Sequence, residues 1–236
     1  MKYVILLLAV ALCASPVTAQ KKDNKEIIKM HSSQGFPSDV AYRYPKFSQG
    51  QVYFKDGTRS TAHMNVNLFL GEMQFLDAKG DTLSIANEDD ISYIAVGTDS
   101  FYVRKGVFET AGDYAYLKLA SKQIIRMVDN EKVGAYGIAS SSASISSMSV
   151  IDQHSKVYSL GANENYVYLK EKTYYLIVKA NNQVLPATKQ NVLKSYSRNR
   201  DRIEDFISAN EIDFKNEADL KKLLAYCTAE ADKKKK

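Results

Sequence analysis

The sequence predicts an α+β protein in which an antiparallel β-meander forms a sandwich or a partly closed barrel, followed by a C-terminal cluster of short helices. Short strand-like runs separated by turn dipeptides fill most of residues 47–133. No helix-length pattern separates these runs, which disfavours a parallel strand–helix–strand topology. After residue 187 the apolar spacing changes from every second residue to every third and fourth, which is typical of amphipathic helices.

Residues 1–19 have the pattern of an export signal. Lys2 gives a positive start, residues 4–12 are an unbroken apolar run, and Val17-Thr18-Ala19 offers a cleavage site before Gln20. The run is too short to span a bilayer stably. The sequence therefore predicts export, to the periplasm first and to the cell surface or medium as alternatives, with no transmembrane segment in the mature chain. Bulky Leu12 before Cys13 disfavours a lipid anchor at that cysteine.

The charge of the mature chain excludes a nucleic-acid partner. Lys2 and the four C-terminal lysines account for the whole excess of +5, so residues 20–232 carry no net formal charge. Nucleic-acid binding needs a basic patch within the fold. Residues 231–236 are interpreted as a solvated Lys-rich tail. Cys227, the one cysteine left after cleavage, lies at an apolar helical position and is expected to be a buried, inert thiol.

Residues 20–46 are polar and broken by glycine and proline, and they predict a flexible leader whose Tyr42, Tyr44 and Phe47 can pack on the body.

Residues 47–133 predict an antiparallel β region. Asp56-Gly57 is a favoured hairpin turn. Residues 62–70 alternate with period 2, which predicts a strand with one face on the core. The apolar face carries Ala62, Met64, Val66, Leu68 and Leu70, and the other face carries His63, Asn65, Asn67 and Phe69.

The remaining strands of this region are expected at about 52–54, 73–76, 83–85, 91–96, 101–103, 114–119 and 124–128. The run at 91–96 is nearly all apolar and is expected to be central. Residues 134–150 are rich in serine and predict a loop or linker, with a binding loop as the alternative. Residues 151–186 predict further strands at 156–160, 166–170 and 174–178.

Residues 187–230 predict three short helices. Thr188 is expected to cap the first, which runs to about Tyr196. The spacing of Ile203, Phe206 and Ile207 predicts the second. Asn216 is expected to cap the third, whose apolar stripe is Leu220, Leu223, Leu224 and Cys227.

Two parts of the chain resemble uncharacterised exported β-rich proteins of the Bacteroidota. The first part holds Asp56-Gly57, Met64-Asn65-Val66-Asn67, the run from Gly71 to Phe75 and the run from Lys79 to Leu83, and the second runs from Asn191 to Leu224. Together these segments cover about a third of the chain, and the Ala19-Gln20 cleavage site agrees with the resemblance. The resemblance implies a periplasmic or surface location in a Gram-negative cell, and it implies no particular activity.

No catalytic or cofactor motif occurs in the sequence, so no cofactor and no metal site are predicted. The nucleophile elbow, the zinc-protease pair, the phosphate-binding loops and the paired-cysteine motif are all absent. His31, His63 and His154 are scattered. Glu88-Asp89-Asp90 is interpreted as a solvated turn, because paired catalytic carboxylates or a calcium loop need a different spacing.

Tyrosine is the residue type that stands above background, with 16 Tyr, 9 Phe and no Trp. Strand tyrosines pack and pair for structural reasons alone, but an exposed tyrosine face also makes a binding platform. The surface candidates for ligand binding are Tyr114, Tyr116, Tyr166, Tyr168, His63, Asn65 and Asn67.

The sequence favours a non-catalytic exported module that binds another component of the envelope, either a protein or a glycan. One alternative is a hydrolase of envelope glycans or peptides, which needs two acids within reach of each other across a cleft. Another is a carrier of an apolar ligand in a barrel-like cavity, which needs an internal void lined by residues such as Met64, Leu68, Phe75 and Ile94.

Overall fold

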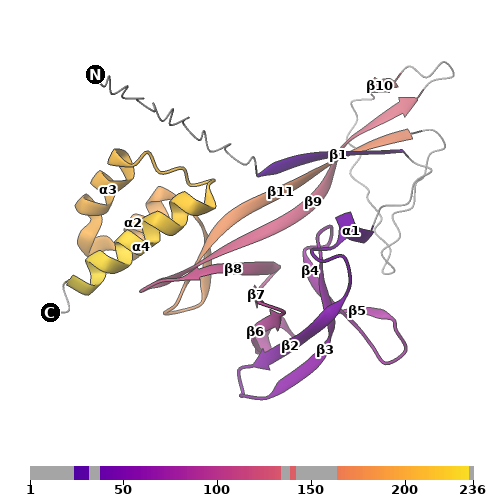
Figure 1. The fold of residues 1–236 in the computed structure, drawn as a ribbon, viewed down its shortest axis with the longest axis horizontal. Helices are drawn as coiled ribbons and strands as arrows, with labels where there is room; N and C mark the ends of the chain where they lie inside the picture. Colours follow the sequence, from indigo (N-terminus) through magenta and orange to yellow (C-terminus); the bar gives the residue numbers. More distant parts are fainter. Residues whose placement is uncertain (1–23, 32–37, 134–138, 142–163, 234–236) are drawn as a thin grey trace, which may run out of the picture.

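The computed structural model describes residues 24–31, 38–133, 139–141 and 164–233. Within these ranges, a twelve-stranded antiparallel sheet is followed by three helices (Figure 1), which confirms the predicted fold class. The expected export signal, most of the Ser-rich segment and the strand predicted at 156–160 lie outside the described residues.

The strands follow one another in space in the order β1-β11-β9-β8-β7-β6-β2-β3-β4-β5, with β10 beside β9 and β12 beside β11. Seven consecutive neighbours, from β4 through β3, β2, β6, β7 and β8 to β9, form the curled part of the sheet. The bounds of the strands are β1 (Lys25–His31), β2 (Ser48–Phe54), β3 (Arg59–Asn67), β4 (Glu72–Leu76), β5 (Thr82–Ser84), β6 (Ile91–Val96), β7 (Asp99–Val103), β8 (Val107–Asp113), β9 (Leu117–Val133), β10 (Ala139–Ser141), β11 (Glu164–Val178) and β12 (Gln183–Pro186).

The curled part encloses the first of two cores. Met64, Val66 and Leu68 are buried in it, as the alternation at 62–70 predicts, and Ile94 and Phe101 join them from β6 and β7. The prediction is wrong at the end of the run: β3 ends at Asn67, so Leu70 is 36% exposed and Phe69 packs against the core. The sheet curls far enough for the backbone N–H of Ile125 in β9 to donate to the carbonyl of Leu68 at 2.9 Å. The turn between β3 and β4 therefore meets β9, and among the described strands the barrel is only partly closed.

Strands β9 and β11 form a long ribbon that serves two cores. At one end Leu119 and Leu176 pack against the helices, and further along Ile125 and Tyr168 pack into the barrel core. In place of each of these long strands the sequence predicts two short ones, because a polar stretch interrupts the apolar pattern near Lys122. That stretch lies between the two cores, and β9 and β11 pair without a break through it.

The leader prediction is wrong for part of residues 20–46. Residues 25–31 form edge strand β1, which pairs along its whole length with β11. Its Ile28 and Met30 pack against the barrel core beside Tyr168. A one-turn helix α1 (Ser38–Ala41) follows. Apolar residues at every second position within a polar segment are enough to add a strand where a long partner strand is available.

The three predicted helices are present as α2 (Lys189–Ser195), α3 (Arg200–Ala209) and α4 (Glu217–Lys233). The tail predicted at 231–236 is wrong for residues 231–233, which form the last turn of α4. Short 3₁₀ turns precede β6 (Glu88–Asp90) and join α2 to α3 (Ser197–Asn199). The Thr188 side chain accepts the N–H of Asn191, and Asn216 Oδ1 accepts the N–H groups of Ala218 and Asp219, so both predicted caps are confirmed. None of the described helices has the length and apolar character needed to cross a membrane.

The helices cover one end of the long ribbon and form the second core. Leu220, Leu223, Leu224 and Cys227 are fully buried, which confirms the predicted stripe of α4. Burial raises the pKa of the Cys227 thiol to about 12, so this thiol stays protonated and unreactive.

An ion-pair cluster ties the start of α4 to the long ribbon. Glu217 accepts from Lys172 Nζ of β11 at 2.7 Å and pairs with Lys221 one helical turn later at 2.9 Å. Partial burial raises the pKa of Glu217, but the hydrogen bonds from the two lysines outweigh it and lower the pKa to about 2. A depressed folded-state pKa contributes stability above the ordinary value of 4.5, and this contribution is lost as the pH falls toward 2.

We therefore expect Glu217→Gln to flatten the acid dependence of stability. Urea unfolding at pH 7 and pH 3 should show a smaller loss of unfolding free energy on acidification for the variant than for the wild type. Asp205→Asn, an exposed carboxylate of α3, is the control and should leave the wild-type loss unchanged. Equal acid dependence of Glu217→Gln and the wild type would show that the cluster contributes nothing.

Candidate functional site

The predicted polar face of β3 is buried. Asn65 and Asn67 are only 1% and 2% exposed, so these two surface candidates are wrong as surface residues. The Asn65 side chain accepts the backbone N–H of Tyr44 at 3.0 Å and donates to the Tyr44 carbonyl at 2.8 Å. Asn67 donates to Gln74, which also accepts from the Tyr42 hydroxyl. Residues 41–44 lie against the end of β3, so the two asparagines hold chain segments together.

The four tyrosine candidates do not form one platform. Tyr168 is buried in the barrel core, where burial raises its pKa to about 12, and Tyr166 packs beside it. Tyr114 packs against the helical core, and Tyr116 is 42% exposed but lies against Tyr196. His63 is exposed and stands apart from all four on β3.

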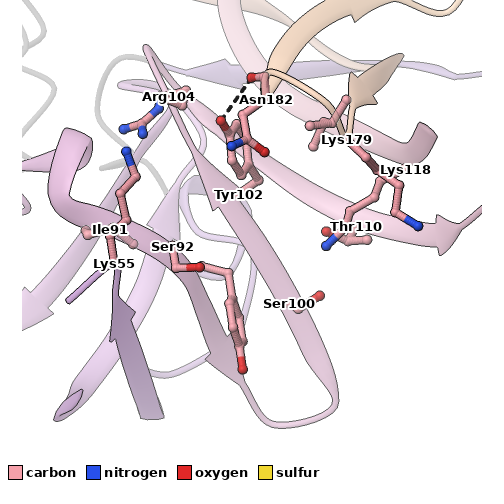
Figure 2. A pocket seen from close by; sticks show the side chains of 12 residues that line it. Lys55, Ile91, Ser92, Ser100, Tyr102, Arg104, Thr110, Lys118, Lys179 and Asn182 are labelled. Carbon is pink, nitrogen blue, oxygen red and sulfur yellow. Dashed lines mark hydrogen bonds between the residues drawn. The ribbon is translucent and has the colours of Figure 1, made fainter. Parts of the chain in front are cut away.

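A different surface brings polar and aromatic groups together. A groove of about 520 Å³ lies over the outer face of strands β6 to β9 and β11, beside the turn between β11 and β12 (Figure 2). We call it the outer groove. Its lining residues are Lys55, Ile91, Ser92, Tyr93, Ser100, Tyr102, Arg104, Thr110, Lys118, Ile177, Lys179 and Asn182.

Local sequence explains why these side chains point outward. In β7, Phe101 and Val103 are buried in the barrel core, so the alternating residues Ser100 and Tyr102, and Arg104 after them, face the groove. A small apolar cluster of Phe108, Ala120 and Ile177, from the neighbouring strands β8, β9 and β11, is buried beside the groove. The Tyr102 hydroxyl donates to the carbonyl of Asn182 at 3.0 Å and so joins the β11–β12 turn to β7 (Figure 2).

The charged groups of the outer groove are all cationic. Lys55 and Arg104 lie at one end, and Lys118 and Lys179 lie at the other, with Tyr102 and Asn182 between them (Figure 2). Asp113, outside the lining, pairs with Lys179 at 2.5 Å and with Lys118 at 3.9 Å. Among the described residues, Lys55 has no ion-pair partner. Two aspartates outside the lining, Asp113 and Asp89, thus pair with three of the four cations, which leaves the groove positive on a body without net charge.

The second aspartate belongs to a neighbouring hollow. Arg104 Nη1 donates to Asp89 Oδ1 at 2.9 Å and to the Glu88 carbonyl at 2.6 Å. Arg104 and Asn182 also line a second pocket of about 620 Å³, whose rim carries Glu88, Asp89 and Asp90. We call this the acidic pocket. Arg104 therefore lies at the boundary between the outer groove and the acidic pocket.

Tyr93 adds an aromatic face to the groove. Its ring stacks on that of Tyr53 with centroids 4.3 Å apart and planes 12° apart, and the Arg59 guanidinium lies 4.9 Å from the centre of the Tyr53 ring. Tyr93 is still 40% exposed. Support from behind holds the ring in one orientation and leaves its outer face available to a ligand.

Two carboxylates of the barrel, Glu109 and Asp99, share the cation Arg43. Glu109 accepts two hydrogen bonds from Arg43 at 2.9 and 3.1 Å, and Asp99 accepts the Tyr44 hydroxyl at 2.6 Å, with Arg43 3.9 Å from it. Neither carboxylate lines the outer groove or the acidic pocket. The contacts of these two carboxylates are therefore explained by the ion pair with Arg43 and the hydrogen bond from Tyr44.

Other chemistry finds little support in the described residues. No group of three or more His, Cys, Asp or Glu side chains among them is placed to hold a metal ion. Met64, Leu68 and Ile94 are at most 2% exposed and Phe75 packs against them, so the residues proposed to line a carrier cavity belong to the packed core.

None of the seven candidate residues lines the outer groove. The alternation of Ser100, Tyr102 and Arg104 with buried neighbours is visible in the sequence and marks an outward polar row. The sequence does not show that Lys55 and Lys179, 124 positions apart, lie beside that row, because strand order and register decide it.

Comparison with known proteins adds no relative. No protein-family model matches the chain, no curated protein matches it, and no solved structure matches it.

Proposed function

We propose that this protein is an exported, non-catalytic binding module of the cell envelope, and that its ligand occupies the outer groove. The observation that carries the proposal is the convergence of four cations and one supported tyrosine face on a groove whose lining contains no carboxylate, histidine or cysteine. Groups of this kind hold a ligand by charge, hydrogen bonds and stacking. Carboxylates and histidine, the side chains that most often act as general acids and bases, are absent from this lining.

The export signal pattern and the resemblance to exported proteins of the Bacteroidota support an envelope location. Both come from the sequence: the first from residues 1–19, and the second from the segments at 56–83 and 191–224. A periplasmic or surface module meets envelope glycans and proteins, and these are the ligands we propose.

The proposal predicts that capture of the ligand depends on groove charge. Lys55→Glu should reduce capture of the main envelope component by about tenfold or more, because it reverses a charge at the ligand. The measurement is a crosslinking pull-down with the chain from residue 20, incubated with an envelope fraction of its own cell. Lys79→Glu is the matched control, because Lys79 is also exposed, lies in the turn between β4 and β5 and lines neither pocket.

Equal capture by the wild type and Lys55→Glu would remove the outer groove as the binding site. Equal loss in both variants would mean that net charge and not the groove determines capture. Both variants should keep the wild-type unfolding midpoint, since both positions are exposed.

A further inference from the structure

Resting on the proposed function, we infer that the ligand of the outer groove is an acidic glycan, a chain of sugar rings that carry carboxylates. Three kinds of group in the groove match three features of such a chain: negative charge, hydroxyl groups and a flat apolar ring face.

Charge selects an anion. The Arg104 guanidinium is fixed by the carbonyls of Glu88 and Asp89, and its bond to the Asp89 carboxylate is the one that a ligand carboxylate can take over. Lys55, Lys118 and Lys179 are point charges along the rest of the groove. The side chain of Asp89 already occupies part of Arg104 and is itself 96% exposed. A ligand carboxylate can replace it with little loss, because an exposed ion pair contributes little.

Sugar hydroxyls find matching partners between the cations. Ser92, Ser100, Thr110, Tyr102 and Asn182 offer hydroxyl and amide groups that both donate and accept hydrogen bonds. An acidic peptide with a similar charge presents far fewer hydroxyl groups, so it leaves most of these partners to water.

Tyr93 supplies the flat apolar surface. One face of a sugar ring is made of C–H groups, and covering it with an aromatic ring removes apolar area from water. Tyr53 and Arg59 support Tyr93 from behind, so little conformational entropy is lost when a sugar ring stacks on it.

The acidic pocket gives the chain a direction. The space beyond Arg104 is lined by three carboxylates, Glu88, Asp89 and Asp90, and by one further cation, Lys105, so it is less favourable for a carboxylated chain than the outer groove. The favourable path therefore runs from Arg104 across Tyr102 toward Lys118 and Lys179, along the basic part of the groove (Figure 2).

The test measures binding of defined probes to the chain from residue 20 by calorimetry. The acidic probes are hexagalacturonate and an oligomannuronate, maltohexaose is the neutral glycan, and hexaglutamate is the acidic peptide. We expect at least one acidic glycan to bind about tenfold or more tightly than maltohexaose and hexaglutamate, because only it satisfies both the cations and the hydroxyl partners.

Variants then locate the binding. Arg104→Gln should lower the affinity for the acidic glycan about tenfold, and Tyr93→Ala should lower it about fivefold. Asp89→Asn should raise this affinity by roughly twofold to fivefold, the range that an exposed ion pair contributes. Tyr116→Ala, which removes a tyrosine of nearly equal exposure, should leave it unchanged.

Three results would overturn the inference: neither acidic glycan binds, hexaglutamate binds as tightly as the glycans, or Tyr93→Ala has no effect. If envelope capture is lost in Lys55→Glu but neither acidic glycan binds, the groove remains the site and only the ligand class is wrong. If capture does not depend on the groove, the proposed function itself fails.

Discussion

Asn65→Ala should lower the free energy of unfolding by about 2–4 kcal/mol, because it leaves buried backbone groups without partners. The Asn65 side chain satisfies the N–H and the carbonyl of Tyr44 and is 1% exposed. An alanine methyl replaces none of these bonds, and the buried site admits little water in exchange. Urea unfolding followed by circular dichroism measures the loss.

His63→Ala is the matched control for this prediction. His63 lies two residues earlier on the same strand and is exposed, so its removal should change stability by no more than about 0.5 kcal/mol. If the two variants lost the same stability, Asn65 would not hold residues 41–44 against β3, and its interpretation as a surface residue would be restored.

Leu224→Ala should lower the free energy of unfolding by about 2–5 kcal/mol, the range for truncating a fully buried leucine. Leu224 is 0% exposed and belongs to the core that α4 shares with Leu119 and Leu176 of the long ribbon. Since this core joins the helices to the ribbon, the cavity weakens the attachment of the helical cluster.

Lys222→Ala, an exposed position two residues away on α4, should cost at most about 0.5 kcal/mol. A loss for Leu224→Ala no greater than for Lys222→Ala would mean that the helices do not depend on this core. Hydrogen exchange of α4 distinguishes local detachment from global unfolding, because only detachment exposes α4 while β2 to β8 stay protected.

The helices could be predicted closely because their signals are local. Thr188 and Asn216 act within three residues of themselves, and the stripe of Leu220, Leu223 and Leu224 repeats within one helix. The hairpin turn at Asp56-Gly57 is equally local, since Gly57 adopts the positive φ of 88° that such a turn favours.

The burial of Asn65 and Asn67 could not be predicted from alternation. Alternation in β3 correctly separates Met64 and Val66 from the asparagines, but it does not show what covers the second face. That cover is the segment around Tyr44, 21 residues away, which aligns with the end of β3. A polar row on a strand therefore marks either a solvent face or a hydrogen-bonded contact with another segment.

The outer groove escapes sequence analysis for a related reason. Its cations are spread from Lys55 to Lys179, and each taken alone resembles an ordinary solvated lysine or arginine. Strand order brings them together, since β6, β7, β8, β9 and β11 are neighbours in the sheet. The nearly continuous apolar run at 91–96 predicts a central strand, and this pattern does not mark Tyr93 as one of its exposed positions.

The central claim is that ligand meets the protein at the outer groove, and site-specific photocrosslinking in living cells tests it most directly. A benzophenone amino acid replaces Tyr93 in one variant and Tyr116 in the other, two tyrosines that are 40% and 42% exposed. The account predicts that irradiation links an envelope component to position 93 and not to position 116. Crosslinks at position 116 alone, or equally at both, would contradict it.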